Sequence, residues 1–237
     1  MNSSFPWHTG RLAGFDLETT GVDVEADRIV TATVVQCGGE QPTVPANWLA
    51  DPGVEIPEGA AKVHGITTEK ARTEGKPAAE VVADLLAALG QVIASGVPVV
   101  AMNARFDFTL LDREAARYGL PPLPGGPVID PLVLDKHVDQ YRSGKRNLTA
   151  LCAHYGVPLG AAHTSDADAI AACRVAWRIG STRPALAALS LDELHSAQIR
   201  WAAGQAAGLQ AHLRQKDPAA YCPPVWPLIP RQQNGER

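Results

Sequence analysis

The sequence lacks an apolar stretch long enough for a membrane span. Its most apolar region, residues 81–102, is broken by five residues that a spanning helix disfavours: Asp84, Gln91, Ser95, Gly96 and Pro98. This region therefore predicts a helix followed by a strand. The first seven residues hold no basic cluster followed by an apolar run, so a secretory leader is not expected. We expect no association with a membrane.

Cysteine pairs are also missing. The four cysteines of the chain are widely spaced, and none of them belongs to a CxxC pair. A disulfide framework usually has many cysteines in a short secreted chain. The spacing here is more typical of reduced, mostly buried thiols, and it predicts a cytoplasmic protein.

An excess of basic residues is absent too, because the formal net charge is −4. Proteins that bind nucleic acid usually carry a basic footprint. Evidence for such a partner must therefore come from a local site and not from the balance of charge. The chain also holds no polymerase domain, nucleotide-binding loop or convincing sliding-clamp peptide.

The chain has 46% hydrophobic residues, which is normal for a globular protein and excludes a disordered one. Apolar patterns predict five strands, at residues 11–18, 28–38, 41–49, 97–102 and 128–130. Helical spacing predicts helices near residues 77–93, 105–118, 131–138, 147–155 and 165–179. This order indicates an α/β fold with a mixed five-stranded sheet flanked by helices.

The composition changes after residue 182. The sequence becomes rich in Ala and Gln, predicts one long helix near residues 191–215, and ends in a Pro-rich segment at residues 218–230. We therefore expect a domain over residues 1–182 and a C-terminal helical and Pro-rich extension over residues 183–237. Three tail aromatics, Trp201, Tyr221 and Trp226, are expected to dock this extension onto the domain.

Two carboxylates stand close together on the first predicted strand. Asp16 and Glu18 are two residues apart, so their side chains project on the same side of a strand, while Phe15 and Leu17 face the core. Two neighbouring acids at the end of a buried strand repel each other and are costly to desolvate. A hard divalent cation with oxygen ligands removes this cost. The alternative is a solvated strand end that carries two acids by chance.

Two more acids lie at the starts of predicted helices. Asp107 follows the fourth strand, and Asp168 follows His163 by five positions. Each has a structural alternative, because the helix dipole favours an acid in the first turn. Asn103 also suits an N-cap, and Ser165 with Asp168 fits a capping pattern that would leave His163 an incidental loop residue.

Together these elements resemble the DEDDh exonucleases, a ribonuclease-H-like family with relatives among proofreading subunits and ribonuclease T. The resemblance covers residues 11–179. It rests on D-x-E-T-T-G at 16–21, V-H-G-I-T at 63–67, N-x-x-F-D at 103–107, V-I-D-P at 128–131 and H-x-x-x-x-D-A at 163–169. Position 164 is Thr, not the Tyr of the sister branch. Met102 stands where many members have His, and this change is expected to affect packing only.

The resemblance implies a metal-dependent 3′–5′ exonuclease. Two Mg²⁺ or Mn²⁺ ions would be bound by Asp16, Glu18, Asp107 and Asp168. The two ions would lie close enough together for both to contact one scissile phosphate. His163 would act as general base, because an imidazole accepts a proton readily near neutral pH.

The resemblance also implies residues that contact the substrate. His64 would contact the terminal nucleotides, Thr19 and Thr20 would offer backbone or hydroxyl contacts near the 3′ end, and Asn103 and Phe106 would lie beside them. Phe106 is a possible base-stacking wedge, although such a helical position more often belongs to the core.

The expected substrate is single-stranded DNA or a frayed 3′ end, and a DNA polymerase or repair complex is a possible partner. Two alternatives stay open, namely an RNA-trimming ribonuclease and a non-catalytic module associated with a polymerase. Phosphate contacts are expected from Lys145 and Arg146, or from Lys136 and Arg142, if these are not solvated surface charges. Asp130 is expected to cap the helix that begins at residue 131.

Overall fold

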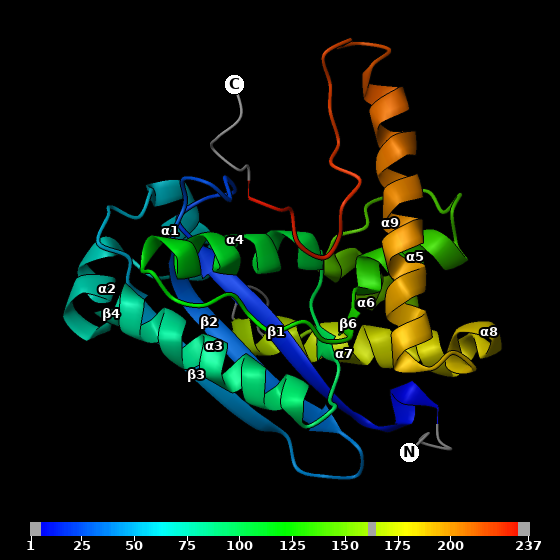
Figure 1. Ribbon diagram of the computed structural model, residues 1–237, viewed down its shortest axis with the longest axis horizontal. Helices are drawn as coiled ribbons and strands as arrows, with labels where there is room; N and C mark the ends of the chain where they lie inside the picture. Colours follow the sequence, from blue (N-terminus) through cyan, green and yellow to red (C-terminus); the bar gives the residue numbers. More distant parts are fainter. Residues whose placement is uncertain (1–5, 161–164, 232–237) are drawn as a thin grey trace.

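The structure is a computed structural model that describes residues 6–160 and 165–231 (Figure 1). A mixed sheet lies at its centre, with the strand order β4-β3-β2-β1-β5-β6. The strands are β1 (Arg11–Thr19), β2 (Ile29–Gly38), β3 (Val44–Asp51), β4 (Lys76–Pro77), β5 (Val99–Val100) and β6 (Val128–Ile129). The prediction of a mixed α/β sheet is confirmed.

The sheet has six strands where the sequence predicts five. The additional strand, β4, pairs in parallel with the end of β3 through Ala50 and Asp51. It has two residues, too few for an alternating pattern, and one of them is the proline that the sequence places at the start of a helix. Tertiary contact with β3 creates this strand, and local sequence therefore gives no signal for it.

The helices are α1 (Glu58–His64), α2 (Thr68–Glu74), α3 (Ala78–Ala94), α4 (Ala104–Arg117), α5 (Pro131–Val138), α6 (Leu148–Tyr155), α7 (Ser165–Thr182), α8 (Pro184–Ala187) and α9 (Leu191–Leu213), with a 3-10 turn at Trp7–Thr9 before β1. Six of these correspond to the predicted helices. The short helices α1, α2 and α8 are additional. α1 buries none of its residues, so it lacks the apolar periodicity on which the prediction depends.

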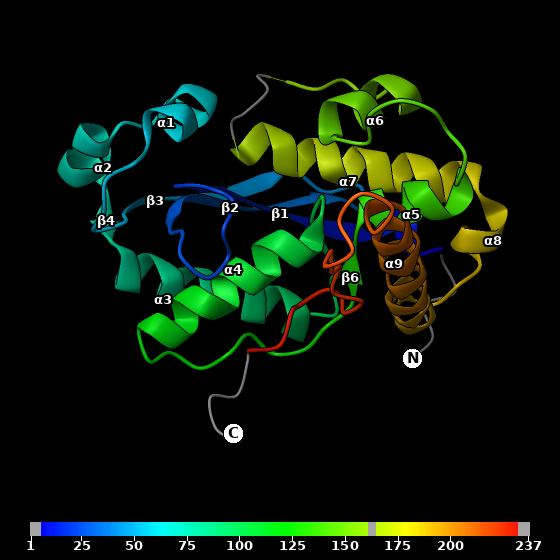
Figure 2. The same ribbon diagram turned by 90° about the horizontal axis from the view of Figure 1, so that it is seen from above.

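The helices cover both faces of the sheet. Figure 2 shows α3 and α4 on one face and α7 with α6 on the other. Phe15 and Leu17 of β1 belong to the core shared with α3 and α4, whereas Leu12 belongs to the core shared with α6 and α7. Alternate residues of β1 therefore face different layers, which places Asp16 and Glu18 toward α7.

The direction of the strands positions the site. β1 pairs antiparallel with β2, whereas β5 runs parallel to β1 and β6 runs parallel to β5. The carboxyl ends of β1, β5 and β6 therefore meet at one edge, where α4 and α5 begin. In the two described ranges, no helix is long and apolar enough to cross a membrane.

The C-terminal extension is part of the same body. Ala202 of α9 and Trp226 of the tail belong to the core that includes β1. Trp201 stacks on His137 of α5, with ring centroids 3.6 Å apart. The predicted docking is confirmed for Trp201 and Trp226, whereas Tyr221 is 69% exposed and does not serve this role.

Candidate active site

The first two acids lie at the end of β1. Asp16 is paired in register with Thr33 of β2, and Glu18 follows two residues later on the same side. Burial raises the pKa of Asp16 most strongly, and the charges of Asp107, Glu18 and Asp168 raise it further. Electrostatic effects of this kind act over short distances. The acids predicted from separate motifs therefore come together.

Asp107 is the most enclosed of the four, with 4% of its surface exposed. It lies in the first turn of α4, directly after β5. Burial raises its pKa, while hydrogen bonds from its own amide and from the Leu17 amide oppose the shift. The helix dipole would favour an acid in this turn whether or not it contacts β1. The hydrogen bond from the Leu17 amide of β1 is therefore not explained by the dipole alone.

Asp168 lies in the first turn of α7. Burial and the charge of Asp168 together raise the pKa of Glu18 to about 7. The start of α7 is fixed to the sheet, because the Ser165 and Thr33 hydroxyls form a hydrogen bond of 2.7 Å. Ser165 therefore holds α7 against β2, beside the strand that carries Asp16.

A close approach of α7 to β1 makes this contact possible. A Cβ atom on Gly14 would lie 2.5 Å from the carbonyl oxygen of Ala169 and 3.0 Å from Sγ of Cys173. Only glycine leaves room for the backbone of α7 at this distance. Gly14 is thus a supporting residue that the sequence analysis missed, although a glycine inside a strand can signal close backbone approach.

The remaining predicted catalytic residue, His163, lies outside the described residues, which omit 161–164. Its role as general base stays a prediction.

The four carboxylates fit a divalent cation by their chemistry. They are hard oxygen donors, which suit Mg²⁺ and Mn²⁺. The raised pKa values of Asp16, Glu18 and Asp107 indicate that burial and mutual repulsion disfavour their charged forms, a cost that a bound cation removes. In the part of the chain that the structure describes, no three His, Cys, Asp or Glu side chains are already gathered as ligands of one ion. The donors and their charge are therefore present without a preformed coordination shell.

The hydroxyls of the two predicted substrate threonines are occupied within the loop after β1. Thr19 donates to the carbonyl of Gly21 at 2.6 Å. Thr20 is buried and donates to Asp27 at 2.6 Å. These hydrogen bonds shape the loop, so substrate contacts near Thr19 and Thr20 would have to come mainly from the backbone.

His64 lies beside the end of β1, and its predicted contact with the terminal nucleotides stays a prediction. It is the last residue of α1, and its Nδ1 accepts the amide of Ile66 at 3.2 Å. Burial lowers its pKa, and the backbone of Thr19 opposes this shift. The neutral imidazole thus lies next to the strand that carries Asp16 and Glu18.

Asn103 and Phe106 flank the start of α4. Asn103 is exposed and left-handed, with φ of 63°. It is the N-cap residue of α4, as the structural alternative predicts, but its side chain makes no cap hydrogen bond. Its side chain is therefore available to a ligand. Phe106 is partly buried and packs against the core, which favours the packing role over a free base-stacking wedge.

Asp130 caps α5 as predicted, because its Oδ1 accepts the amide of Leu132 at 2.9 Å. It also does more. Its carboxylate accepts the amides of Asn103 and Ala104, both at 3.0 Å, and the indole N–H of Trp226 at 3.2 Å. Asp130 therefore fixes the turn that leads into Asp107, a positioning role that the sequence analysis missed.

The basic residues near α5 are mostly engaged internally. The guanidinium groups of Arg142 and Arg146 both reach the buried carboxylate of Asp135, at 2.9 and 2.5 Å. They hold the α5–α6 connection together and are not free for phosphate contacts. Lys145 is exposed, and Lys136 is half-buried.

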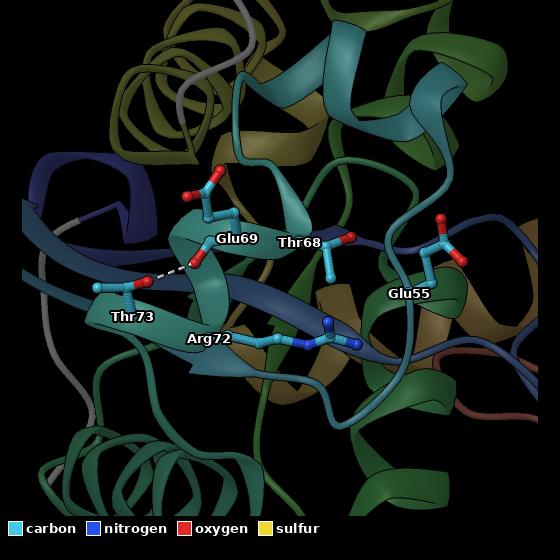
Figure 3. Close-up of a pocket in the computed structure, with 5 residues that line it drawn as sticks. All are labelled: Glu55, Thr68, Glu69, Arg72 and Thr73. Carbon is cyan, nitrogen blue, oxygen red and sulfur yellow. Dashed lines mark hydrogen bonds between the residues drawn. The ribbon is translucent and has the colours of Figure 1, made fainter.

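A separate hollow of about 570 Å³ lies beside α2 (Figure 3). Its lining residues are Glu55, Thr68, Glu69, Arg72 and Thr73. None of them belongs to the four-carboxylate group, and the figure shows the Thr73 hydroxyl turned back to the carbonyl of Glu69. The hollow is thus distinct from the site at the sheet edge.

Solved structures share this fold. E. coli exonuclease I in complex with a dA16 oligonucleotide superposes with a TM-score of 0.64 at 20% identity, covering 75% of this chain and 42% of that one. Exonuclease I from Methylocaldum szegediense gives a TM-score of 0.58 at 21% identity with the same coverage. At these identities the likeness shows the ribonuclease-H-like fold.

Sequence relatives are larger proteins. A PolC-type DNA polymerase III from Staphylococcus epidermidis is 29% identical over 154 residues, 65% of this chain and 10% of the polymerase. The Staphylococcus aureus protein is 26% identical over 181 residues, 76% of this chain and 12% of its own length. The chain thus spans about a tenth of these polymerases. The sequence model described as "Exonuclease" matches residues 13–176, which contain every described acid of the site, and the chain belongs to this family of DnaQ-like exonucleases.

Proposed function

We propose that this protein is a 3′–5′ exonuclease that hydrolyses phosphodiester bonds at the 3′ ends of single-stranded or frayed DNA. The observation that carries the proposal is the convergence of Asp16, Glu18, Asp107 and Asp168 at one sheet edge, in a chain of the exonuclease family. Acids with raised pKa values in such a cluster favour a functional site over solvated strand and helix ends.

The four carboxylates would hold two divalent ions, Mg²⁺ or Mn²⁺. Ions held there would supply Lewis-acid activation of the attacking water and would offset negative charge on the departing 3′ oxygen. His163 is assigned the proton of the attacking water, because a neutral imidazole is the best proton acceptor near pH 7. His64 and the exposed Asn103 would orient the terminal nucleotides.

DNA is the favoured polymer, since the fold matches an exonuclease solved with a dA16 oligonucleotide and the sequence matches DNA polymerases. The polymerase relatives also support association with a polymerase or repair complex. Trimming of RNA is the second candidate, because contacts to a 2′ hydroxyl depend on loops whose sequence does not identify the sugar. A non-catalytic role is disfavoured, since the full set of five site residues is retained.

The test is a digestion panel of DNA and RNA oligonucleotides labelled at either end, with Mg²⁺, Mn²⁺, Ca²⁺ or chelator. We expect mononucleotides from free 3′ ends with Mg²⁺ or Mn²⁺, little activity with Ca²⁺, whose ligands lie farther away, and none with chelator. Asp16→Asn should abolish the activity, with the same change at exposed Asp166 as control. Release from 5′ ends, cutting within a closed circle or full digestion in chelator would contradict the proposal.

A further inference from the structure

Helix α9 runs along β6 toward the edge that carries the acids. The amide of Val128 donates to Nδ1 of His195 at 3.1 Å, early in α9. The amide of Asp130 donates to the side-chain oxygen of Gln198 at 2.8 Å. The side chain of Gln205 donates to the carbonyl of Val133 at 3.0 Å. These contacts advance along α9 as the chain passes from β6 into α5. The last turns of α9 therefore extend beyond the sheet, as Figure 1 shows.

The tail returns from the end of α9 to the start of α4. The amide of Cys222 donates to the side chain of Gln210 at 3.0 Å. The carbonyl of Pro223 then accepts a hydrogen bond of 2.6 Å from the Arg105 guanidinium. Arg105 and Asp107 both lie in the first turn of α4, so the tail contacts the helix start that contributes Asp107 to the four-carboxylate site.

A small cavity of about 40 Å³ lies between α9, α5 and this turn. Its polar lining includes Asn103, Arg105, Lys136 and Gln205, and Trp226 closes one side. A volume of this size holds a few waters or the oxygens of one phosphate, but it is too small for a nucleobase. The lining also includes Asp130, whose oxygens already accept three amides and one indole N–H.

Two basic side chains, Arg105 and Lys136, line the cavity without an ion-pair partner among the described residues. In the described part of the chain, Lys136 makes no hydrogen bond or ion pair, and Arg105 has no carboxylate partner. Burial lowers the pKa of Lys136, the charges of Arg146 and Arg105 lower it further, and the carboxylates of Asp130 and Asp135 raise it. Both carboxylates are already occupied by other donors. A half-buried ammonium in this position favours an external anion.

We infer that the Arg105–Lys136 cavity binds a backbone phosphate of the substrate strand, upstream of the bond that is cut. The inference rests on the proposed function and extends it to the C-terminal extension. Lys and Arg are the residues that bind phosphate, the first as a point charge and the second through a planar fork. Asn103, which lines the cavity, is the N-cap residue of α4, and Asp107 lies in the first turn of that helix, so the cavity and the four-carboxylate site both adjoin the start of α4.

The test compares Lys136→Gln with Lys70→Gln, in which an exposed lysine of α2 is changed. On a single-stranded DNA oligonucleotide, Lys136→Gln should raise KM about 10-fold with kcat within about twofold, the usual effect of losing one charged contact. The salt dependence of strand binding should weaken by about one unit of slope. Lys70→Gln should leave both KM and the salt dependence unchanged.

Two further measurements separate a phosphate contact from a structural effect. A dinucleotide has no upstream phosphate, so wild type and Lys136→Gln should cleave it equally well. An uncharged methylphosphonate at the contacted position should weaken wild type and leave Lys136→Gln unaffected. Equal losses on the dinucleotide and the longer strand, or a Lys136→Gln protein that behaves like Lys70→Gln, would overturn the inference.

Failure of this inference can be distinguished from failure of the proposed function. If wild type cleaves no oligonucleotide with any metal, the proposed function fails. Fluorescence anisotropy of the same labelled strand then measures its binding, and this tests the phosphate contact in the cavity without any need for cleavage. The same 10-fold loss of affinity in Lys136→Gln supports it, and equal affinities of both variants contradict it.

Discussion

Gly14→Ala tests whether the distance between α7 and β1 controls the site. The added Cβ would lie 2.5 Å from the carbonyl oxygen of Ala169, whereas an ordinary contact begins at 3.4 Å. The neighbouring backbone must therefore move by about 0.9 Å, the difference between these two distances. Ala169 directly follows Asp168, so the shift moves a carboxylate of the site away from Glu18.

Two effects should follow from this shift. Overpacking a close-packed interior costs about 1–3 kcal/mol of unfolding free energy. A displacement of about 1 Å at a reacting centre lowers turnover by about 10²-fold. The backbone of α7 is the obstacle here, and it cannot swing aside as a flexible side chain does. We therefore expect Gly14→Ala to lose both stability and activity.

The assay pairs thermal or denaturant unfolding with initial rates on a 3′-labelled strand. Gly90→Ala in α3 is the matched control, because a Cβ there meets no atom within 4 Å. This control should gain about 0.5–1 kcal/mol, since alanine replaces glycine inside a helix. The reasoning is refuted if Gly14→Ala unfolds and turns over as Gly90→Ala does.

Three other changes test separate parts of the site. His163→Ala should lower kcat by about 10²–10⁴-fold and still bind metal, as expected for a proton acceptor. In the folded protein without metal, the pKa of Glu18 is raised from 4.5 to about 7. Glu18 should therefore contribute fully to the free energy of unfolding below pH 4.5, and this contribution should be lost as pH rises through 7. In unfolding measured with chelator, Glu18→Gln should flatten this loss. Trp226→Phe should cost about 1 kcal/mol of unfolding free energy, because Asp130 loses one donor.

Each of these has its own control. His212→Ala changes an exposed histidine of α9 and should keep wild-type turnover, and a His163→Ala protein that matched it would remove the base assignment. The pH effect should disappear when Mg²⁺ saturates the site; a Glu18→Gln protein with the wild-type pH profile would show that Glu18 does not titrate as stated. Unchanged stability of Trp226→Phe would mean that its hydrogen bond adds nothing.

The acids could be located from sequence because local signals fix both their elements and their direction. Asp16 and Glu18 lie on a strand with clear alternation, and Asp107 and Asp168 begin strongly periodic helices. Parallel pairing of β5 with β1 brings the ends of these strands together. An ordered set of motifs therefore predicts the site even though each motif alone has a structural alternative.

The contacts that support the site could not be found in the same way. Asp130 reads as a helix cap, and nothing local shows that it also accepts the amides of Asn103 and Ala104. Arg142 and Arg146 look like surface charges until Asp135 is seen to be buried between them. Such roles depend on which elements meet in space, and sequence spacing carries no information about those meetings.

The C-terminal extension forms hydrogen bonds with the outer side of β6. β6 is an edge strand, so the backbone groups on its outer side lack a strand partner. Buried backbone groups of this kind need hydrogen bonds. His195 accepts the Val128 amide, and the fully buried side chain of Gln198 donates to the Val128 carbonyl at 2.8 Å and accepts the Asp130 amide. A glutamine from the Ala- and Gln-rich helix thus does for β6 what a neighbouring strand would do. Since Asp130 also fixes the turn before Asp107, the same contacts tie the C-terminal extension to the geometry of the acids.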